Sequence, residues 1–401
     1  MGKSPHALLK RITDWLALER NIIIMVLAVL VITLGEQMWQ KFVPKYLEAL
    51  GASTLIIGLY GSIKLMLGAF YQYPGGVISD KLGARKALTL FSIMATAGYI
   101  LYLISWNWEI FLLGTFLVMV WDSMSQPALF SLIGEVLKKR QRAMGFSVQS
   151  ILKRIPIIIA PPLGGLLIMN LGLIEGMKIG FTITILLTMF ASIFQYKFYT
   201  QRERRKDSIT ISLLETSKMM KKELKYLLIA DILARFGSYM ASQYIVLYII
   251  NILGGSSLDF GLLVSVQMAT AISTYLPAAK MADMYGRRPL IALTFTFFSL
   301  YTLALGITNT LAIVPVSFIL AGLREVGEPA RKALIVDLAE DPYRGRIIGL
   351  YYLIRELIGF PAPIIGGLLW YFNPRCTFLL ASIISSIGLL LFLLKVKEKQ
   401  A

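Results

Sequence analysis

Long apolar runs alternate with short polar segments along almost the whole chain. The runs are residues 21–47, 54–79, 87–105, 109–137, 143–169, 176–198, 226–252, 258–281, 290–308, 311–333, 345–371 and 376–394. A helix needs roughly twenty apolar residues to cross a bilayer, and these runs meet that length. Because lipid offers the backbone no hydrogen-bond partner, each run is expected to be a helix. The pattern therefore predicts an all-α membrane protein with twelve transmembrane helices.

The longest polar interruption lies at the middle of the chain. It covers residues 200–225, is rich in lysine and arginine, and is partly amphipathic in its second part. We interpret it as a connector at the membrane surface, and binding to anionic lipid or to a partner is the alternative. Its position predicts an N-terminal six-helix bundle over 1–199, a cytoplasmic linker over 200–225 and a C-terminal six-helix bundle over 226–401.

Composition agrees with a membrane protein and excludes several other classes. Of the 401 residues, 57% are hydrophobic and 16% are charged, whereas soluble domains are about a quarter charged. The net charge of +17 comes from bases scattered over short loops, so a nucleic-acid surface is not indicated. The single Cys376 and the single His6 exclude an intrachain disulfide and a histidine or thiolate metal cluster.

The sequence also gives no sign of catalysis. It contains no Gly-x-x-x-x-Gly-Lys-Ser/Thr loop for nucleotide phosphates and no histidine in the apolar part that could serve as a base. We therefore expect no enzyme activity and no cofactor. The basic, mixed start of the chain is not typical of a cleaved signal peptide.

The bases in the loops predict the orientation. Most lie on the side shared by both termini, while the opposite loops contain mainly Lys41, Lys45, Lys178 and Arg375. Since loops rich in lysine and arginine stay in the cytoplasm, both termini are expected to be cytoplasmic. The predicted location is the cell inner (plasma) membrane, with multiple spans.

A polar turn between the second and third runs recurs about two hundred residues later. The first copy reads Gly76-x-x-x-Asp80-Lys81-x-Gly83-x-Arg85-Lys86, and the second, within 279–289, repeats its aspartate, glycine and arginine at the same spacing. Further matches in the same order are Gln126-Pro127-Ala128 with Glu328-Pro329-Ala330, Glu135 with Asp337, Arg142 with Arg346, and 160–165 with 362–367. The chain is therefore interpreted as an internal duplication.

The first turn resembles the loop signature between the second and third transmembrane helices of the major facilitator superfamily. This resemblance implies a transporter fold of two pseudo-symmetric six-helix halves, whose midplane site opens to each side alternately. It also implies a cytoplasmic gate, a charge network that latches the outward-open state. The gate residues would be Gly76, Asp80, Gly83, Arg85, Glu135, Arg142, Asp283, Gly286, Arg288, Asp337 and Arg346. The second copy departs from the signature because Ala279 replaces a glycine.

Charges within the apolar runs separate two kinds of span. The third, sixth, ninth and twelfth runs carry none in their interiors and are predicted to face lipid. The first, second, fourth, fifth, seventh, tenth and eleventh runs hold charges and are predicted to line a water-filled cavity. The candidate substrate and proton-coupling residues are Glu36, Gln37, Lys64, Asp122, Gln126, Arg154, Arg324, Glu328, Arg355 and Glu356. Glu36 or Asp122 would carry the proton. Asp122 and Arg324 occupy equivalent positions in the two halves and could either form a salt bridge or act directly in transport.

Several of these charges have a simpler interpretation. Asp231 and Arg235 stand one helical turn apart, so a local ion pair is favoured over a substrate site. Arg355 and Glu356 are adjacent and are expected to point to different faces. Lys64 could extend towards water or pair with Glu36.

Residues 160–165 resemble the fifth-helix Gly-Pro-x-x-Gly-Gly signature of drug and metabolite antiporters in the same superfamily, although the similar segment 362–367 indicates symmetric packing as an alternative. The leading hypothesis is a monomeric secondary active transporter that works by alternating access and couples the efflux of amphiphilic or drug-like small molecules to protons. Its partners would be the small-molecule substrate, protons or another coupling ion, and the lipid bilayer. An organic-anion exchanger or uptake carrier, a lipid or lysolipid flippase, and a non-transporting receptor or scaffold are the alternatives.

Overall fold

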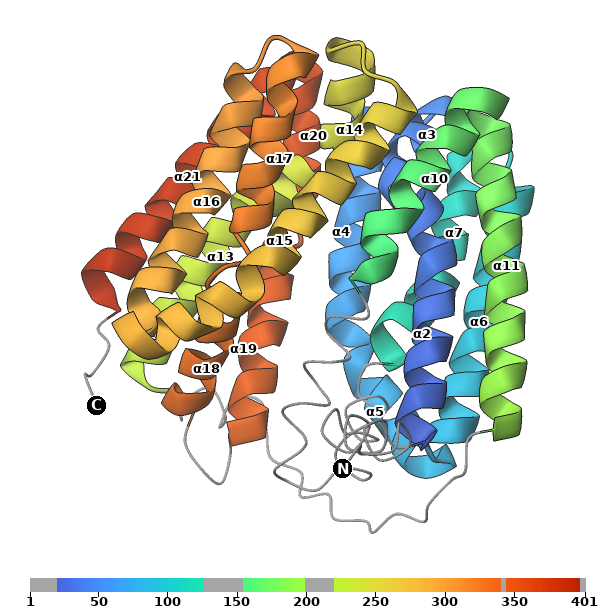
Figure 1. The fold of residues 1–401 in the computed structure, drawn as a ribbon, viewed down its shortest axis with the longest axis horizontal. Coiled ribbons are helices and arrows are strands. Elements are labelled where there is room, and N and C mark those ends of the chain that lie inside the picture. The colour runs from blue at the N-terminus through green and yellow to red at the C-terminus, as the bar shows by residue number, and fades with distance from the viewer. Residues whose placement is uncertain (1–19, 126–153, 199–219, 340–343, 397–401) are drawn as a thin grey trace, which may run out of the picture. The chain divides into compact units, whose positions relative to one another are not determined.

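The computed structural model describes residues 20–125, 154–198, 220–339 and 344–396. Within these ranges every regular element is a helix and no strand occurs. In the first part of the chain the elements are α2 (Arg20–Trp39), η1 (Gln40–Phe42), α3 (Val43–Ala49), α4 (Thr54–Phe70), α5 (Gln72–Leu82), α6 (Ala84–Ile104), α7 (Trp108–Met119), η2 (Val120–Met124), α10 (Ile155–Leu171) and α11 (Leu173–Phe198) (Figure 1).

The second part begins with α13 (Lys222–Ser242), α14 (Ile245–Leu247), η3 (Tyr248–Ile252), α15 (Ser257–Tyr285), α16 (Arg287–Ile307), η4 (Leu311–Ile313) and α17 (Val314–Leu323). It ends with α18 (Glu328–Leu338), α19 (Arg344–Gly359), α20 (Ala362–Phe372) and α21 (Pro374–Lys395).

Each of the twelve predicted apolar runs contains at least one of these helices. Among the residues that the structure describes, six helical stretches are long and apolar enough to cross a membrane: Thr54–Ser79, Arg85–Ile104, Leu173–Phe198, Arg287–Ile307, Arg344–Phe372 and Pro374–Lys395. Other runs are divided by short irregular turns, for example between α17 and α18. The predicted all-α membrane fold is therefore confirmed, and the breaks are features that the apolar pattern did not reveal.

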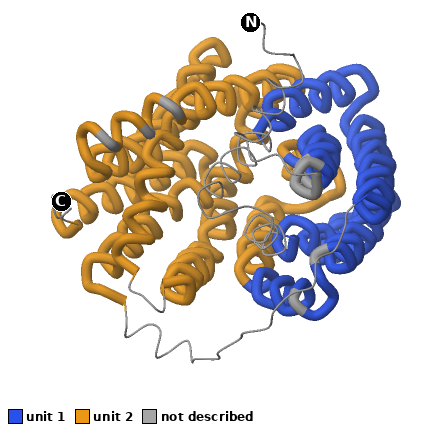
Figure 2. Tube along the Cα trace, turned by 60° about the horizontal axis from the view of Figure 1, so that its bottom comes forward, with its two compact units in different colours: residues 1–40, 70–207 blue, residues 41–69, 208–401 orange. Residues whose placement is uncertain are grey.

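The chain forms two compact units (Figure 2). Unit 1 consists of residues 1–40 and 70–207, and unit 2 of residues 41–69 and 208–401. Residues 41–69 belong to unit 2 because α4 approaches its helices closely: the hydroxyl of Tyr244 donates hydrogen bonds to the carbonyl oxygens of Thr54 (3.0 Å) and Pro363 (2.9 Å).

The helices without interior charges expose rows of large apolar side chains. On α11 the row contains Leu186, Met189, Phe190 and Ile193, and on α21 it contains Ile383, Ile387, Leu390 and Leu394. In both rows the spacing of three or four residues places the side chains on one face of the helix. Exposed rows of this kind suit contact with lipid and support the prediction that these helices are peripheral.

The same close helix contact occurs once in each unit. A Cβ atom at Gly164 of α10 would overlap the carbonyl oxygen of Met38 in α2, and a Cβ atom at Gly366 of α20 would overlap that of Met240 in α13. A single shift of 202 residues relates Gly164 to Gly366 and Met38 to Met240. The resemblance of 160–165 to an antiporter signature is therefore accompanied by a symmetric packing role.

Replacing one of these glycines is expected to destabilise the protein. Gly366→Ala forces α20 away from the Met240 carbonyl, and overpacking of this kind costs about 1 to 3 kcal/mol. The matched control is Gly349→Ala on the neighbouring α19, where a new Cβ would have no heavy atom within 4 Å. In thermal unfolding of the purified protein, Gly366→Ala should lower the midpoint and Gly349→Ala should preserve or raise it. Equal midpoints would contradict the close contact.

Candidate functional site

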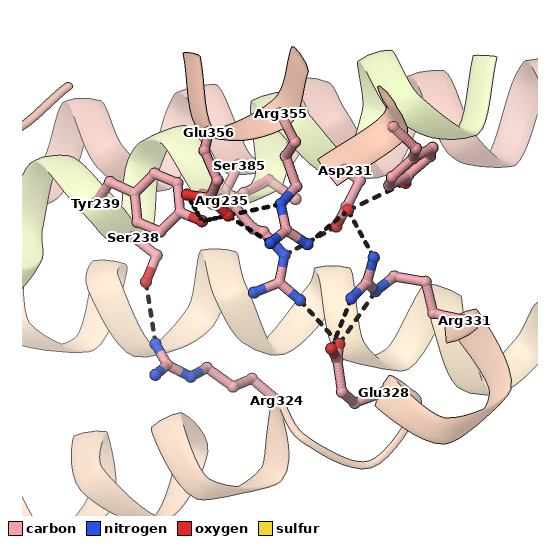
Figure 3. A network of polar contacts seen from close by, with 12 residues as sticks. Asp231, Arg235, Ser238, Tyr239, Arg324, Glu328, Arg331, Arg355, Glu356 and Ser385 are labelled. Atoms are coloured by element: carbon pink, nitrogen blue, oxygen red, sulfur yellow. Dashed lines mark hydrogen bonds and ion pairs between the residues drawn. The ribbon is translucent and has the colours of Figure 1, made fainter. Parts of the chain in front are cut away.

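A buried ion pair joins two helices of unit 2. Asp231 of α13 is fully buried, and one of its carboxylate oxygens accepts a hydrogen bond from Arg331 Nη1 at 2.7 Å (Figure 3). Arg331, on α18, is itself fully buried. The hydroxyl of Tyr351 on α19 donates to the same carboxylate at 3.0 Å. Through this one acid, α13 is joined to α18 and α19, which lie about one hundred residues later in the sequence.

Glu328 and Arg235 extend this ion pair. Glu328 accepts hydrogen bonds from Arg331 Nη2 at 2.6 Å and Nε at 3.0 Å, which is a bidentate pair on one helix. Arg235 bridges the two acids, because its Nε donates to Asp231 at 3.0 Å and its Nη2 to Glu328 at 2.8 Å. The sequence interpretation of Asp231 and Arg235 as a merely local pair is therefore incomplete.

Arg355 and Glu356 of α19 complete the group. Contrary to the expectation that these neighbours point to different faces, the Arg355 guanidinium pairs with the Glu356 carboxylate. Both side chains are long enough to bend towards each other at the surface of α13. There the Tyr239 hydroxyl lies 3.1 Å from both Glu356 oxygens, and Arg355 Nη1 lies 3.6 Å from Asp231.

The resulting cluster is electrically balanced. It contains three acids and three bases: Asp231, Glu328, Glu356, Arg235, Arg331 and Arg355. Isolated charges are costly in a membrane, and pairing with hydrogen bonds is how such charges are retained. We call these six residues the balanced cluster.

Arg324 lies beside the balanced cluster in a break of the tenth span. Residues 324–327 are a turn between α17 and α18, and the amide of Gly327 donates to Thr294 Oγ1 at 2.7 Å. Arg324 Nη1 donates to Ser238 Oγ at 3.0 Å, and its Nε lies 3.9 Å from the Glu325 carboxylate. Broken helices at membrane depth are typical of binding sites, because irregular backbone is tolerated where it lines a cavity.

Unit 2 contains two further basic side chains within its predicted spans, Lys41 and Lys64. Lys41, in the turn η1, is close enough to Lys64 and Arg324 to be repelled by both. The ammonium group of Lys64 lies 5.5 Å from the centre of the Tyr60 ring. Lys41 lies in the helical turn between α2 and α3 rather than in a loop, and it was not among the predicted site residues.

Unit 1 holds a buried acid. Glu36 of α2 is only 3% exposed, and the buried hydroxyl of Tyr99 on α6 donates a hydrogen bond to it. The Trp39 ring packs edge-on against Tyr99, with 6.0 Å between the ring centres. Next to Glu36, the buried Gln37 donates from Nε2 to Gln40 at 2.7 Å. The Gln37 Oε1 atom accepts no hydrogen bond from the part of the chain that the structure describes.

Asp122 lies in a helical irregularity. It is half-buried in η2, a π-helical turn at the end of α7, and such turns are frequent at functional sites. The shift of 202 residues brings Asp122 onto Arg324, so the equivalent point of each half is an irregular turn that bears a charge. Arg154 is half-buried just before α10, while Gln126 lies outside the described residues.

The internal repeat is also visible in hydrogen bonds. Tyr99 donates to Glu36 in unit 1, and the equivalent Tyr301 donates to Ser238 in unit 2 at 2.8 Å. Both tyrosines and both acceptors are related by 202 residues. The same scaffold therefore holds a carboxylate in one half and, in the other, a hydroxyl that also accepts from Arg324.

The glycines of the two predicted gate motifs have the conformation that their turns require. Gly83 separates α5 from α6 with φ +76°, and Gly286 separates α15 from α16 with φ +81°. Positive φ is easily adopted only by glycine. In α5, Gly75 beside the predicted Gly76 makes a close approach to the backbone of Met124.

The gate charges are only partly visible. Asp337 pairs with Arg287, and Arg288 Nη2 donates to the Leu393 carbonyl at 2.6 Å. The Arg85 guanidinium lies 4.2 Å from the centre of the Tyr196 ring. Arg346 is half-buried at the start of α19. Glu135 and Arg142 lie outside the described residues, and of Asp80 and Asp283 only the backbone is described, so the predicted latch remains a prediction.

Some residues of the balanced cluster were absent from the predicted site. Asp231, Arg235 and Arg331 belong to polar stripes along α13 and α18, and this spacing was a usable signal. Tyr239 and Tyr351, which bond to this cluster, gave no signal in the sequence, because tyrosines are common in apolar helices. Of the predicted residues, Glu328, Arg355 and Glu356 come together in the cluster, with Arg324 beside it.

A family model and two relatives of known sequence match most of the chain. The family model described as Major Facilitator Superfamily matches residues 24–224 and 227–401. An uncharacterised MFS-type transporter of Methanocaldococcus jannaschii is 21% identical over 394 residues, which cover 94% of this chain and 95% of that protein. The multidrug resistance protein MdtH of Sodalis glossinidius is 22% identical, covering 76% of this chain and 74% of that protein.

Solved structures of transporters share the fold. The nucleoside transporter NupG superposes with a TM-score of 0.79 at 13% identity, covering 94% of this chain and all of that one. The human organic anion transporter MFSD10 superposes with a TM-score of 0.69 at 16% identity, covering 93% of this chain and 99% of that one.

Proposed function

Since the chain belongs to the Major Facilitator Superfamily, we propose that it is a proton-coupled secondary transporter that exports amphiphilic or drug-like small molecules by alternating access. It would act as a monomer in the cell inner membrane, with both termini cytoplasmic. Its two halves would rock around a midplane site, and the coupling ion would be the proton.

The observation that supports proton coupling best is the buried Glu36. Its carboxyl group lies in an apolar, aromatic part of unit 1 and is held by the Tyr99 hydroxyl. A carboxyl group in such a place takes up or releases a proton when its neighbours change. If the alternating motion changes those neighbours, substrate and proton are linked through this one group.

The direction of transport is supported by the relatives. MdtH is a multidrug resistance protein, and a quinolone resistance protein, NorA of Staphylococcus aureus, is 22% identical over 37% of this chain. The site residues of this chain also include aromatic rings beside charges, as at Tyr60 and Tyr301. Such surroundings suit molecules with an apolar body and a polar group.

Transport itself is tested with the purified full chain in liposomes. Liposomes loaded with unlabelled amphiphile are diluted into labelled amphiphile. Uptake of the label is measured and compared with uptake by liposomes without protein. The proposal predicts counterflow that depends on the protein and is inhibited by an excess of unlabelled substrate. A receptor or scaffold would bind the compound and produce no counterflow.

The predicted gate is tested by Asp80→Asn. The amide removes most of the attraction between the carboxylate and a helix N-terminus, which is worth roughly 0.3 to 2 kcal/mol. This loss is expected to shift the resting population several-fold towards the inward-open state. Spin labels on the cytoplasmic ends of the second and eleventh spans should then lie farther apart. An unchanged distance distribution together with reduced transport would show that Asp80 is not a latch.

A further inference from the structure

Residues 41–69 belong to different parts of the protein by sequence and by packing. By sequence they contain the second part of the first span and the first part of the second span, within the predicted N-terminal bundle. In the structure they belong to unit 2, together with residues 208–401. They form the helical hairpin of α3 and α4, which we call the strap. The strap is therefore connected to one half through the chain and packed onto the other.

The strap packs closely against α20 because small residues lie where the two elements meet. A Cβ atom at Gly58 of α4 would lie 2.5 Å from the carbonyl oxygen of Pro363. In the opposite direction, a Cβ atom at Gly367 of α20 would lie 2.6 Å from the carbonyl oxygen of Thr54. The hydroxyl of Thr54 also donates to the Gly367 carbonyl at 3.2 Å. Small residues of this kind let helix backbones approach one another without ion pairs.

Three polar side chains connect the tip of the strap to η3. Lys45 and Glu48 of α3 form an ion pair, and the side-chain oxygen of Asn251 in η3 accepts a hydrogen bond from Lys45. The Asn251 amide nitrogen donates to Glu48 Oε1 at 2.8 Å. We call these three residues the clasp. Because 36% of the Glu48 side chain is exposed, water can replace its bonds, so the clasp can open at little cost.

Both ends of the strap coincide with a break in a span. The first span leaves α2 through η1, a 3-10 turn, before α3 begins. The second span is interrupted at Tyr71, a turn between α4 and α5. A 3-10 turn within a helix often marks a hinge. Near the second break, a Cβ atom at Gly68 would meet no heavy atom within 4 Å. The strap therefore has a possible hinge at each end and open space beside one of them.

We propose that the strap is a hinged gate at the outer end of the protein. It releases α20 and η3 when the outer side opens, and it bends at η1 and at Tyr71 as it does so. This inference rests on the proposed function, because the turn between α3 and α4 faces outward if both termini are cytoplasmic. It goes beyond the rocking of two rigid halves, since the outer parts of two spans move separately from the rest of their bundle.

Cross-linking tests whether the strap must be released. Lys45→Cys and Asn251→Cys are combined with Cys376→Ser, and the two thiols are joined by ethanediyl bismethanethiosulfonate, whose bonds a reductant cleaves. Counterflow is measured with the full chain in liposomes. The cross-link should abolish counterflow, and the reductant should restore it. The matched control joins Asn309→Cys to Arg375→Cys, a bonded pair outside the strap, and its cross-link should leave counterflow unchanged.

Spin labels test the bending separately from transport. One label replaces the exposed Ala49 at the tip of the strap, and the second replaces either Ile313 of unit 2 or Leu171 of unit 1, which are both exposed. Glu48→Ala removes the acid of the clasp and should raise the population with a longer distance to Ile313 by about twofold to fivefold. Because the strap bends, the distance to Leu171 should change as well.

The control for Glu48→Ala is Glu175→Ala. Glu175 pairs with Lys178 at the same spacing of three residues, but this pair lies outside the strap. Glu175→Ala should therefore leave both distance distributions unchanged.

Other results would contradict specific parts of the proposal. Full counterflow by the protein cross-linked between the strap and η3 would overturn the strap as a gate. A longer distance to Ile313 at a constant distance to Leu171 would show that the bundle moves as a rigid body and would overturn the hinges. Absence of counterflow in the parent protein would contradict the proposed function, and the spin-label distances would then decide on the strap alone.

Discussion

Arg331→Met is expected to be the most destabilising single substitution in unit 2. The Arg331 side chain is 1% exposed and satisfies both Asp231 and Glu328. Its removal leaves the balanced cluster with one excess negative charge in a buried place, and breaking a buried ion pair in this way costs about 3 to 5 kcal/mol. Thermal unfolding in detergent should show a midpoint lower by more than about 5 °C.

Two further variants make this prediction specific. Arg287→Met breaks the exposed pair with Asp337, and an exposed pair contributes only about 0 to 1 kcal/mol. Adding Glu328→Gln to Arg331→Met restores neutrality, so the double variant should recover part of the lost stability. The balanced cluster would have no structural role if Arg331→Met and Arg287→Met had the same effect.

The second large effect is expected at Glu36. Glu36→Gln has nearly the same shape and can still accept from Tyr99, but it cannot carry a proton. In liposomes with an imposed pH gradient, this variant should exchange substrate across the membrane and fail to concentrate it. The expected loss of accumulation is complete, since coupling requires a titrating group.

Asp122→Asn is made separately, because Asp122 is the other carboxylate of unit 1 predicted to take part. Tyr99→Phe tests positioning, since it removes the hydroxyl that holds Glu36 and leaves the acid. The Tyr99→Phe variant should shift the pH at which transport is half-maximal, and transport should remain coupled to protons. Accumulation at the level of the parent by both Glu36→Gln and Asp122→Asn would exclude these two residues and favour sodium or exchange coupling.

The fold was largely predictable because lipid imposes a simple rule. Apolar runs of sufficient length must be helices, and all twelve contain one in the structure. The turns at Gly83 and Gly286 were predictable as well, since an acid, a glycine and bases in that order suit the end of a span. The break after α17 was not predicted, although residues 324–327 read Arg-Glu-Val-Gly and Pro329 follows in the first turn of α18, because the tenth apolar run was treated as one continuous helix.

The sequence predicts which charged residues belong to the site better than it predicts which of them form ion pairs with one another. Buried charges are expensive, so Glu328, Arg355 and Glu356 could be selected from sequence alone. Their partners depend on how α13, α18 and α19 pack, which no local pattern contains. Arg355 and Glu356 are an example. Adjacent residues of a helix point in different directions, but these two side chains are flexible enough to pair.

The internal repeat also includes a pair of equivalent tyrosines that the sequence motifs did not reveal. Tyr99 and Tyr301 stand 202 residues apart in apolar runs, where a tyrosine attracts no notice. Only their hydrogen bonds to Glu36 and Ser238 show that the two halves preserve one arrangement. At this point one half has a carboxylate, and the other half has a serine that also accepts a hydrogen bond from Arg324.

Proton movement driven by substrate tests the central claim most directly. Liposomes that contain the full chain and a trapped pH-sensitive dye are given a gradient of transported amphiphile and no pH gradient. The account predicts that the internal pH changes as protons move opposite to the substrate, and that liposomes with Glu36→Gln show substrate movement without this change. Substrate movement by the parent protein at constant internal pH would contradict proton coupling.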